Sequence, residues 1–311
     1  MTRALQALIG GLSLLAGCAD AAPRDAVQSA AADPLLTPIA PEYAKRWLTP
    51  EEPIQVHGNT YLVGFEGLTV ALIRTSEGLI LVDGALPQAV GEIEANLTRL
   101  GLSIRDVKYI LSTEPHYDHA GGLAALSRDS GGTVLAAREA AEVLASGQPG
   151  RTDPQFSMLE PMPPVQNLRA MQDGETVTLG EVTVTAHATP GHTPGSMSWS
   201  WRSCEGDDCR DVVFASSFNP ISEDGYRFTA PANRSLHDGF IRTFAAMRAL
   251  PCDILLSAHP GQSGQDGRRA RRAADGLTNS FVDPSACRAY ADRHERLFEA
   301  RVARERAGTE P

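Results

Sequence analysis

Several features that would assign a chain to other classes of protein are missing from this sequence. There is no excess of basic residues, because 28 Lys and Arg stand against 38 Asp and Glu and the formal net charge is -10. An acidic chain without a basic stripe is a poor partner for nucleic acid. No run of eighteen apolar residues follows the first twenty positions, so nothing beyond them is expected to span a bilayer. Gly-x-Ser-x-Gly and Ser-x-x-Lys are also absent, which argues against a serine-nucleophile hydrolase.

The length and composition are those of a globular protein. A chain of 311 residues, of which 42% are hydrophobic and 21% charged, can bury one large core or two modest ones. From Tyr43 to Ala307 there is no linker, repeat or low-complexity tract. We therefore predict a single compact domain over residues 43–307.

The N-terminus has the pattern of an export signal. A short basic segment, Met1–Arg3, precedes an apolar stretch, and Leu15-Ala16-Gly17-Cys18 places small residues before a cysteine, as in lipoprotein signals. We predict a signal peptide over residues 1–17, acylation of Cys18 and a tether over residues 18–42. The protein would then be exported, periplasmic and attached to a membrane by its lipid anchor only. An ordinary secretory signal that happens to contain a cysteine is the alternative.

The cysteine count supports export. Without Cys18 four cysteines remain, an even number that suits disulfides in an oxidising compartment. Four cysteines allow three pairings. Cys204 and Cys209 flank a short turn, which leaves Cys252 to pair with Cys287 and tie a strand to the C-terminal helix. A zinc site is the weaker explanation, because Cys-x4-Cys has no matching second pair.

Apolar runs alternate with helical patterns in two successive groups. In the first group, strands are predicted over 60–64, 69–75, 79–82, 107–112 and 133–136, and helices over 90–100, from 121, and over 138–145. In the second group, strands are predicted over 176–178, 181–186, 197–201, 212–215 and 254–257, with a helix over 238–250 and a long C-terminal helix that Asp283 could cap. Two packed sheets covered by helices satisfy this order, so we predict an α/β fold, a four-layer αβ/βα sandwich.

Metal-binding side chains are concentrated directly after the predicted strand 107–112. Four of them occur within six residues: Glu114, His116, Asp118 and His119. At a strand end, side chains can converge on the crevice above the sheet, and the glycines at 121 and 122 let the next helix approach closely. Imidazole together with carboxylate suits Zn²⁺. His192, in a Thr-Pro-Gly-His-Thr-Pro-Gly turn, and His259, after the strand 254–257, complete a set for two metal ions.

These motifs resemble those of the metallo-β-lactamase superfamily, and more narrowly the class B β-lactamases of the third subclass, from about Trp47 to Leu297. The family's first motif is His-x-His-x-Asp-His, and this chain has Glu114 where the first histidine is usual. Weaker matches are the segments 81–84 and 153–156 and the cysteine at 252. The resemblance implies that one zinc is bound by Glu114, His116 and His192, and a second by Asp118, His119 and His259.

The resemblance also implies a reaction and a substrate. A zinc-bound hydroxide would open the β-lactam ring of antibiotics, with Asp118 orienting the nucleophile or passing a proton. Thioester and lactone hydrolases of the superfamily typically have a metal-bridging aspartate where this chain has Ser217, and the third-subclass β-lactamases have serine there. Asn219 stands where Ser or Thr is usual and keeps a hydrogen-bond donor. Ser217, Asn219 and Gln155 are expected to position the substrate.

The alternatives are a thioester or lactone hydrolase of the same fold, and a zinc-binding protein without turnover. We expect a monomer. Of the other polar residues, Asp83 is expected to orient a ligand histidine and Tyr226 to line the site. His187 is expected to pack near the site, Trp199 and Trp201 to lie in the core or on the sheet, and three histidines to lie on the surface: His57, His237 and His294.

Overall fold

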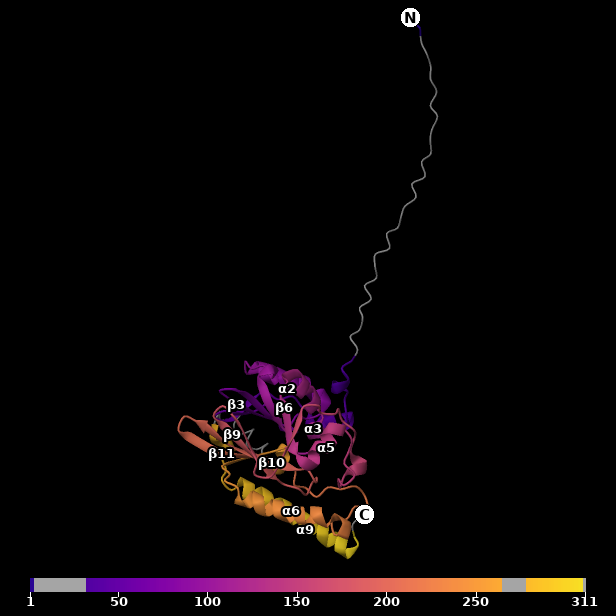
Figure 1. The fold of residues 1–311 in the computed structure, drawn as a ribbon, viewed down its shortest axis with the longest axis vertical. Helices are drawn as coiled ribbons and strands as arrows, with labels where there is room; N and C mark the ends of the chain where they lie inside the picture. Colours follow the sequence, from indigo (N-terminus) through magenta and orange to yellow (C-terminus); the bar gives the residue numbers. More distant parts are fainter. Residues whose placement is uncertain (3–31, 265–277, 310–311) are drawn as a thin grey trace. The chain divides into compact units, whose positions relative to one another are not determined.

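Two β-sheets form the centre of the computed structural model (Figure 1), which describes residues 1–2, 32–264 and 278–309. Cys18 and most of the predicted signal peptide therefore lie outside the described residues. The first sheet contains β1 (Ile54–His57), β2 (Thr60–Leu62), β3 (Ala71–Thr75), β4 (Gly78–Val82), β5 (Val107–Leu111), β6 (Thr133–Ala137) and β7 (Leu168–Met171), in that order. The second contains β12 (Ile254–Ser257), β11 (Asp208–Ala215), β10 (Met197–Glu205), β9 (Val182–Ala188) and β8 (Thr176–Leu179), in that order.

Strand direction places several strand ends at a common edge. In the first sheet β1 to β4 are antiparallel, and β4 to β7 run parallel. In the second sheet β8 to β11 are antiparallel, whereas β11 and β12 are parallel. Parallel neighbours end at the same edge of a sheet, where ligands usually bind in α/β folds. The segment that follows β4 therefore starts next to the segment that follows β5. In the second sheet, the segments that follow β11 and β12 start next to each other in the same way.

Helices cover the outer faces of the two sheets. With the first sheet lie α2 (Val90–Arg99), α4 (Leu123–Ser130) and α5 (Arg138–Ser146), whereas α6 (Arg234–Ala249) and α9 (Ala286–Ala307) lie side by side against the second (Figure 1). Short helices are α1 (Pro41–Trp47), α3 (Tyr117–Ala120) and α7 (Pro260–Ser263), and the 3-10 turns are η1 (Pro34–Leu36), η2 (Pro87–Ala89), η3 (Ile104–Asp106), η4 (Phe156–Met158), η5 (Pro231–Asn233) and η6 (Thr278–Phe281). The predicted four-layer αβ/βα sandwich is confirmed. Among the helices described, none is both long and apolar enough to cross a membrane.

The core has two parts. The larger lies between the sheets and includes Trp199 and Trp201, both buried as expected. The smaller packs α6 and α9 against the second sheet with clustered phenylalanine rings, among them Phe218, Phe240 and Phe298. Phe218 is fully buried and directly follows Ser217, so burial of this one ring fixes the backbone of the loop after β11.

Both disulfides have the pairing expected from the sequence. Cys204 is bonded to Cys209 at the tip of the β10–β11 hairpin, where the two residues are directly opposite in register. Cys252 is bonded to Cys287 and ties the segment before β12 to α9.

Several sequence-based expectations were wrong. His57 and His294 are buried, with 3% and 2% of their surface exposed, and His237 is half-buried. His57 contacts the carbonyl of Asp208 across the two sheets, and His294 faces the core from α9. The helix α9 begins at Ala286, with Ser285 rather than Asp283 directly before it, and the Asp283 side chain accepts a hydrogen bond from the Ser285 N–H in the turn that leads into the helix.

Candidate metal centre

Six potential metal ligands converge near the ends of β5, β9 and β12. They form two groups, one of Glu114, His116 and His192 and one of Asp118, His119 and His259. Within each group the potential ligand atoms all lie within 4.8 Å of one another. Every side chain is buried except that of His259, which is partly exposed. The structure therefore brings together all six residues that the sequence singled out, in the two groups expected.

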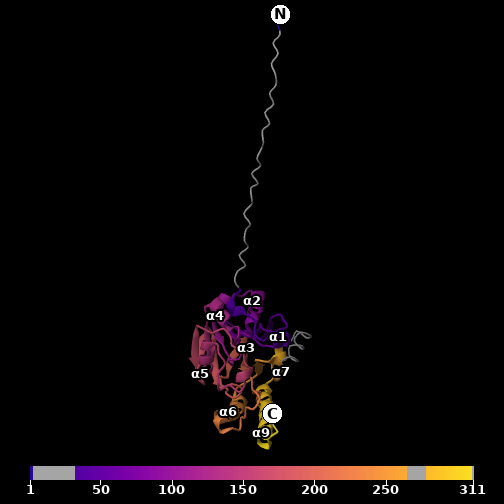
Figure 2. The same ribbon diagram turned by 90° about the vertical axis from the view of Figure 1, so that its right-hand side faces the viewer.

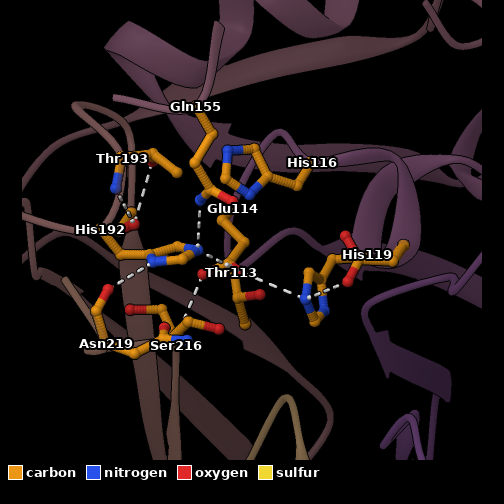
Figure 3. Close-up of polar contacts among 12 residues, drawn as sticks. Thr113, Glu114, His116, His119, Gln155, His192, Thr193, Ser216 and Asn219 are labelled. Atoms are coloured by element: carbon orange, nitrogen blue, oxygen red, sulfur yellow. Dashed lines mark hydrogen bonds and ion pairs between the residues drawn. The ribbon is translucent and has the colours of Figure 1, made fainter. Parts of the chain in front are cut away.

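The two groups are immediate neighbours. His119 Nε2 lies 3.2 Å from Glu114 Oε1 and 3.2 Å from His259 Nε2. Glu114 Oε1 also lies 3.6 Å from His192 Nε2. Figure 3 shows Glu114 between His192 on one side and His119 on the other. One carboxylate oxygen thus faces histidines of both groups.

Close packing of the backbone positions the segment that contains four of these residues. His116 precedes α3, and Asp118 and His119 lie within this single turn. The His119 carbonyl accepts a hydrogen bond from the Gly84 N–H, and the Gly122 N–H donates to the Ala85 carbonyl. A Cβ atom at position 122 would collide with the Gly84 carbonyl oxygen. The close approach expected of this glycine is therefore present, and it fixes α3 against the end of β4.

Three of the histidines have one ring nitrogen directed at a protein acceptor. His192 Nδ1 lies 2.8 Å from the Asn219 carbonyl, and His116 Nε2 lies 2.9 Å from Asp153 Oδ2. His119 Nδ1 lies 3.5 Å from Asp83 Oδ2. A ring nitrogen that donates to such an acceptor has its proton, so the other nitrogen is free to bind a metal. Asp153 was seen in the sequence only as part of a loop, and its contact with His116 was not predicted.

Asp83 is held in an unusual backbone conformation. Its φ of 64° is left-handed, which is rare for a residue with a side chain and persists only where the surroundings fix it. Its two carboxylate oxygens accept hydrogen bonds from the N–H and the hydroxyl of Thr113, at 2.8 and 2.7 Å. Thr113 immediately precedes Glu114, so Asp83 connects the end of β4 to the ligand segment as well as to His119.

The electrostatics of the site favour ionised carboxylates. Burial raises the pKa of Glu114, but the positive charge of His119, His192 and His116 outweighs it and lowers the value to about 2. Burial likewise opposes ionisation of Asp118, yet His119 and His259 hold its pKa well below the usual range. Both side chains are therefore anionic at neutral pH. Among the described residues, buried Glu114 Oε1 meets no donor in hydrogen-bond geometry and has only the nearby histidine rings around it, which fits a site built for a cation.

The three residues expected to position a substrate lie beside the first group. The Ser217 N–H donates to Glu114 Oε2 at 2.9 Å, and Gln155 Nε2 lies 3.2 Å from His192 Nε2. Ser217 Oγ and Asn219 Oδ1 are buried, and neither has a hydrogen-bond partner in the described part of the chain. Neither oxygen is therefore committed to another hydrogen bond within these residues.

Two other residues considered from the sequence lie elsewhere. His187 is part of β9 and contacts the Ser200 hydroxyl, which is the packing role expected. Tyr226 lines a separate cavity of about 780 Å³ together with Pro190 and Pro194, the residues on either side of the His192 turn. None of the six candidate ligands lines that cavity.

Comparisons with known proteins agree with this geometry. The model of the metallo-beta-lactamase superfamily matches residues 63–259. A solved B3 metallo-β-lactamase, described as the first with an active-site glutamic acid, is 51% identical with a TM-score of 0.82, covering 88% of this chain and 99% of its own. Rm3 metallo-β-lactamase is 42% identical with a TM-score of 0.83, covering 85% of this chain and 98% of its own. BJP-1, a subclass B3 metallo-β-lactamase of Bradyrhizobium japonicum, is 36% identical with a TM-score of 0.77, covering 86% of this chain and 99% of its own.

A curated relative shows a more distant similarity. The uncharacterized protein YobT of Bacillus subtilis (strain 168) is 28% identical over 138 residues, or 41% of this chain. The match spans 54% of that protein's length, about half of it.

Proposed function

The chain belongs to the metallo-β-lactamase superfamily and, within it, to the subclass B3 β-lactamases, and from this premise we propose that it is a zinc-dependent hydrolase that opens the ring of β-lactam antibiotics. The observation that supports this most directly is the pair of adjacent three-residue groups of histidine and carboxylate side chains. Two adjacent metal sites can interact with the carbonyl oxygen and with the nitrogen of the same amide bond while it is cleaved.

We assign one zinc ion to each group. Glu114, His116 and His192 would bind the first, and Asp118, His119 and His259 the second. Imidazole nitrogen and carboxylate oxygen are ordinary zinc ligands, and three protein ligands leave a coordination position for water or substrate. One buried Glu114 oxygen has no hydrogen-bond donor among the residues that the structure describes, which is consistent with a metal at this position.

The chain's own residues prepare the site for hydrolysis. When bound, zinc polarises a carbonyl group and makes a water nucleophile available at neutral pH. Asp118, whose pKa lies well below its usual range, is ionised and can accept a proton or a hydrogen bond from the attacking water. Asp153 and the Asn219 carbonyl keep His116 and His192 in single orientations, so these ligands need not reorganise during the reaction.

The substrate would be positioned by Ser217, Asn219 and Gln155. β-Lactam antibiotics have an acidic group next to the amide nitrogen, and the Ser217 hydroxyl and the two side-chain amides can donate hydrogen bonds to it. Within residues 32–264 and 278–309, Ser217 Oγ has no hydrogen-bond partner, which is consistent with this role. A serine at position 217 also disfavours the thioester and lactone hydrolases, which typically have an aspartate there.

Turnover of three substrates by the purified mature protein tests the proposal. We expect hydrolysis of a chromogenic cephalosporin and little action on a thioester or a lactone. Replacement Asp118→Ala should reduce kcat/KM for the cephalosporin at least a thousandfold, whereas His237→Ala on α6, away from the metal centre, should change it less than twofold. Turnover of only the thioester or lactone would favour the rival hydrolases. Full zinc loading without any turnover would favour a binding protein.

We further propose export to the periplasm with a lipid anchor at Cys18, following signal cleavage after residue 17, a tether over 18–42 and a catalytic domain over 43–307. The Leu-Ala-Gly-Cys segment at 15–18 and the two disulfides support this, since disulfides persist in oxidising compartments. Mass spectrometry of the mature N-terminus tests the lipid anchor. Sedimentation of the purified protein tests the expected monomer. Cys18→Ser should move the protein from the membrane fraction to the soluble fraction. An unmodified N-terminus at another residue would contradict the anchor.

A further inference from the structure

An aromatic and cationic surface lies beside the second group of ligands. It consists of Tyr43, Arg46 and Trp47 of α1, which we call the α1 platform. The Trp47 ring lies 5.8 Å from that of His259, and Tyr43 stacks on Trp47 at 5.7 Å with planes 23° apart. Figure 2 shows α1 close to α7, the turn that starts directly after His259.

Backbone packing fixes the α1 platform in place. The Gly67 N–H donates to the Trp47 carbonyl at 3.3 Å. A Cβ atom at position 67 would lie 2.7 Å from both the Arg46 carbonyl oxygen and the Trp47 Cα, so only glycine permits this contact. The C-terminal end of α1 is therefore held by backbone contact with the segment between β2 and β3.

Arg46 is the charged member of the platform and is free to bind a ligand. Its Cζ atom lies 4.7 Å from the centre of the Tyr43 ring and 5.1 Å from that of Trp47. The side chain is exposed, and it forms no ion pair with any residue that the structure describes. Stacking on aromatic rings orients a guanidinium and leaves its in-plane N–H groups free, which matches the geometry of a carboxylate.

If the proposed function is correct, the structure of a β-lactam indicates which part of the substrate would contact the α1 platform. In a β-lactam the ring acid is attached next to the amide nitrogen, and the acyl side chain is attached to the carbon on the other side of the carbonyl. The groups proposed for the ring acid, Ser217 and Asn219, lie with His192 beside the first group. Figure 3 shows Asn219 and His192 on the opposite side of Glu114 from His119. If Ser217 and Asn219 hold the ring acid, a substrate bound across both groups would direct its acyl side chain toward His259 and α1.

We propose that the α1 platform binds the acyl side chain of the substrate, and that Arg46 favours substrates whose acyl side chain has a carboxylate. This inference rests on the proposed function and adds a substrate preference to it. Because Arg46 is solvent-exposed at the rim of the site, the effect on selectivity is moderate rather than absolute.

A matched pair of penicillins tests the proposal. Carbenicillin is benzylpenicillin with one added carboxylate on the acyl side chain, so the ratio of their kcat/KM values isolates that group. With the zinc-loaded protein, Arg46→Ala should lower kcat/KM for carbenicillin about tenfold, mainly through KM, and change it less than twofold for benzylpenicillin. Arg46→Lys should recover part of the loss, because charge is kept and the planar fork is removed. Lys45→Ala, an exposed cation on the same helix, should leave both substrates unchanged.

The possible outcomes distinguish a failure of this inference from a failure of the proposed function. If the parent hydrolyses both penicillins and Arg46→Ala leaves their ratio unchanged, Arg46 does not read the acyl side chain and the inference is wrong. An equal loss with both substrates has the same consequence, because it indicates a general effect on α1. If the parent hydrolyses neither penicillin, the proposed function itself fails and the preference falls with it.

Discussion

A single residue, Glu114, changes the charge of the proposed metal centre. Two Zn²⁺ ions contribute four positive charges and the carboxylates of Glu114 and Asp118 remove two, which leaves +2, whereas a histidine at 114 would leave +3. A lower positive charge stabilises an ionised water less and attracts an anionic substrate less. Against the effect of burial, the neighbouring histidines lower the pKa of Glu114 to about 2, so under mildly acidic conditions this carboxylate is ionised and a proton that opposes metal binding would sit on a histidine ligand instead.

The first prediction follows from this charge difference. Glu114→His should shift the acid limb of the kcat/KM profile to lower pH by up to about one unit, because the extra positive charge lowers the pKa of the attacking water. Glu114→Ala should weaken zinc binding at the first site at least tenfold. Metal titrations and pH profiles of the two variants and the parent measure both effects. If Glu114→Ala keeps the parent's first-site affinity, Glu114 is not a ligand.

At the scale of elements, the site depends on where strands end. Glu114 and His259 follow β5 and β12, and Ser217 follows β11. Each of these strands has apolar residues in its second half, so the strand ends and the residues after them were predictable from the sequence. Two strands were missed, β1 and β7, which form the two edges of the first sheet and are only partly buried, so neither contains a clear apolar run.

Contacts between distant segments could not be predicted in the same way. Asp153 and His116 are 37 positions apart, and nothing local in either segment indicates that they meet. His294 is different, because Tyr290, His294 and Phe298 recur at four-residue spacing and form the buried side of α9. That periodicity is a signal for burial, but the many charged residues of this helix obscured it.

The second prediction concerns the two disulfides. Closing a loop restricts the unfolded chain more as the loop lengthens, so the Cys252–Cys287 bond, with a separation of 35 residues, should stabilise the fold by about 4 kcal/mol. The Cys204–Cys209 bond, with a separation of 5, should contribute about 2 kcal/mol. Paired Cys→Ser replacements and thermal unfolding compare them. A larger loss on removing Cys204–Cys209 would contradict the loop-length argument.

The third prediction concerns His294 in α9. Burial lowers its pKa to about 4, and neither ring nitrogen has a hydrogen-bond partner in the described residues. Between pH 6.5 and pH 4 the unfolded chain binds a proton that the folded chain does not. The folded state should therefore lose stability as pH falls through this window, by up to roughly 3 kcal/mol.

Replacing His294 with leucine isolates that contribution. His294→Leu removes the proton and sacrifices no hydrogen bond, so its free energy of unfolding should fall less than the parent's between pH 7.5 and pH 5. Urea unfolding of both proteins in the presence of a chelator measures the difference without zinc release contributing. Equal losses in the two proteins would show that His294 is not the group responsible.

At the scale of the whole molecule, the net charge has the opposite sign to the charge proposed at the substrate-binding site. The chain has a net charge of -10, yet its proposed substrates are anions. The two zinc ions, and Arg46 at the rim, would supply positive charge where the substrate binds while the rest of the surface repels it. Local fields of this kind guide association more strongly than net charge does.

The fourth prediction is that folding stability depends on both zinc ions. Without a cation, the buried, ionised carboxylates of Glu114 and Asp118 share His119 as a neighbour and are compensated by histidines and, at Glu114, by the Ser217 N–H. Zinc binds the folded chain far better than the unfolded one, so free zinc at about a thousand times its dissociation constant should add about 4 kcal/mol per site. Elemental analysis after dialysis should give close to two zinc ions per chain, and chelation should lower the midpoint of thermal unfolding by roughly 15 °C.

Variants of the two groups make this prediction specific. His192→Ala and Asp118→Ala should each reduce the retained zinc to about one per chain and lose about half of the stabilisation, because they remove ligands of different sites. His237→Ala should bind two ions and respond to chelation like the parent. Retention of one ion or none by the folded parent at saturating zinc would contradict the six-ligand assignment. An unchanged unfolding midpoint after complete chelation would instead show that the protein scaffold alone offsets the buried charge, with the metals needed only for the reaction.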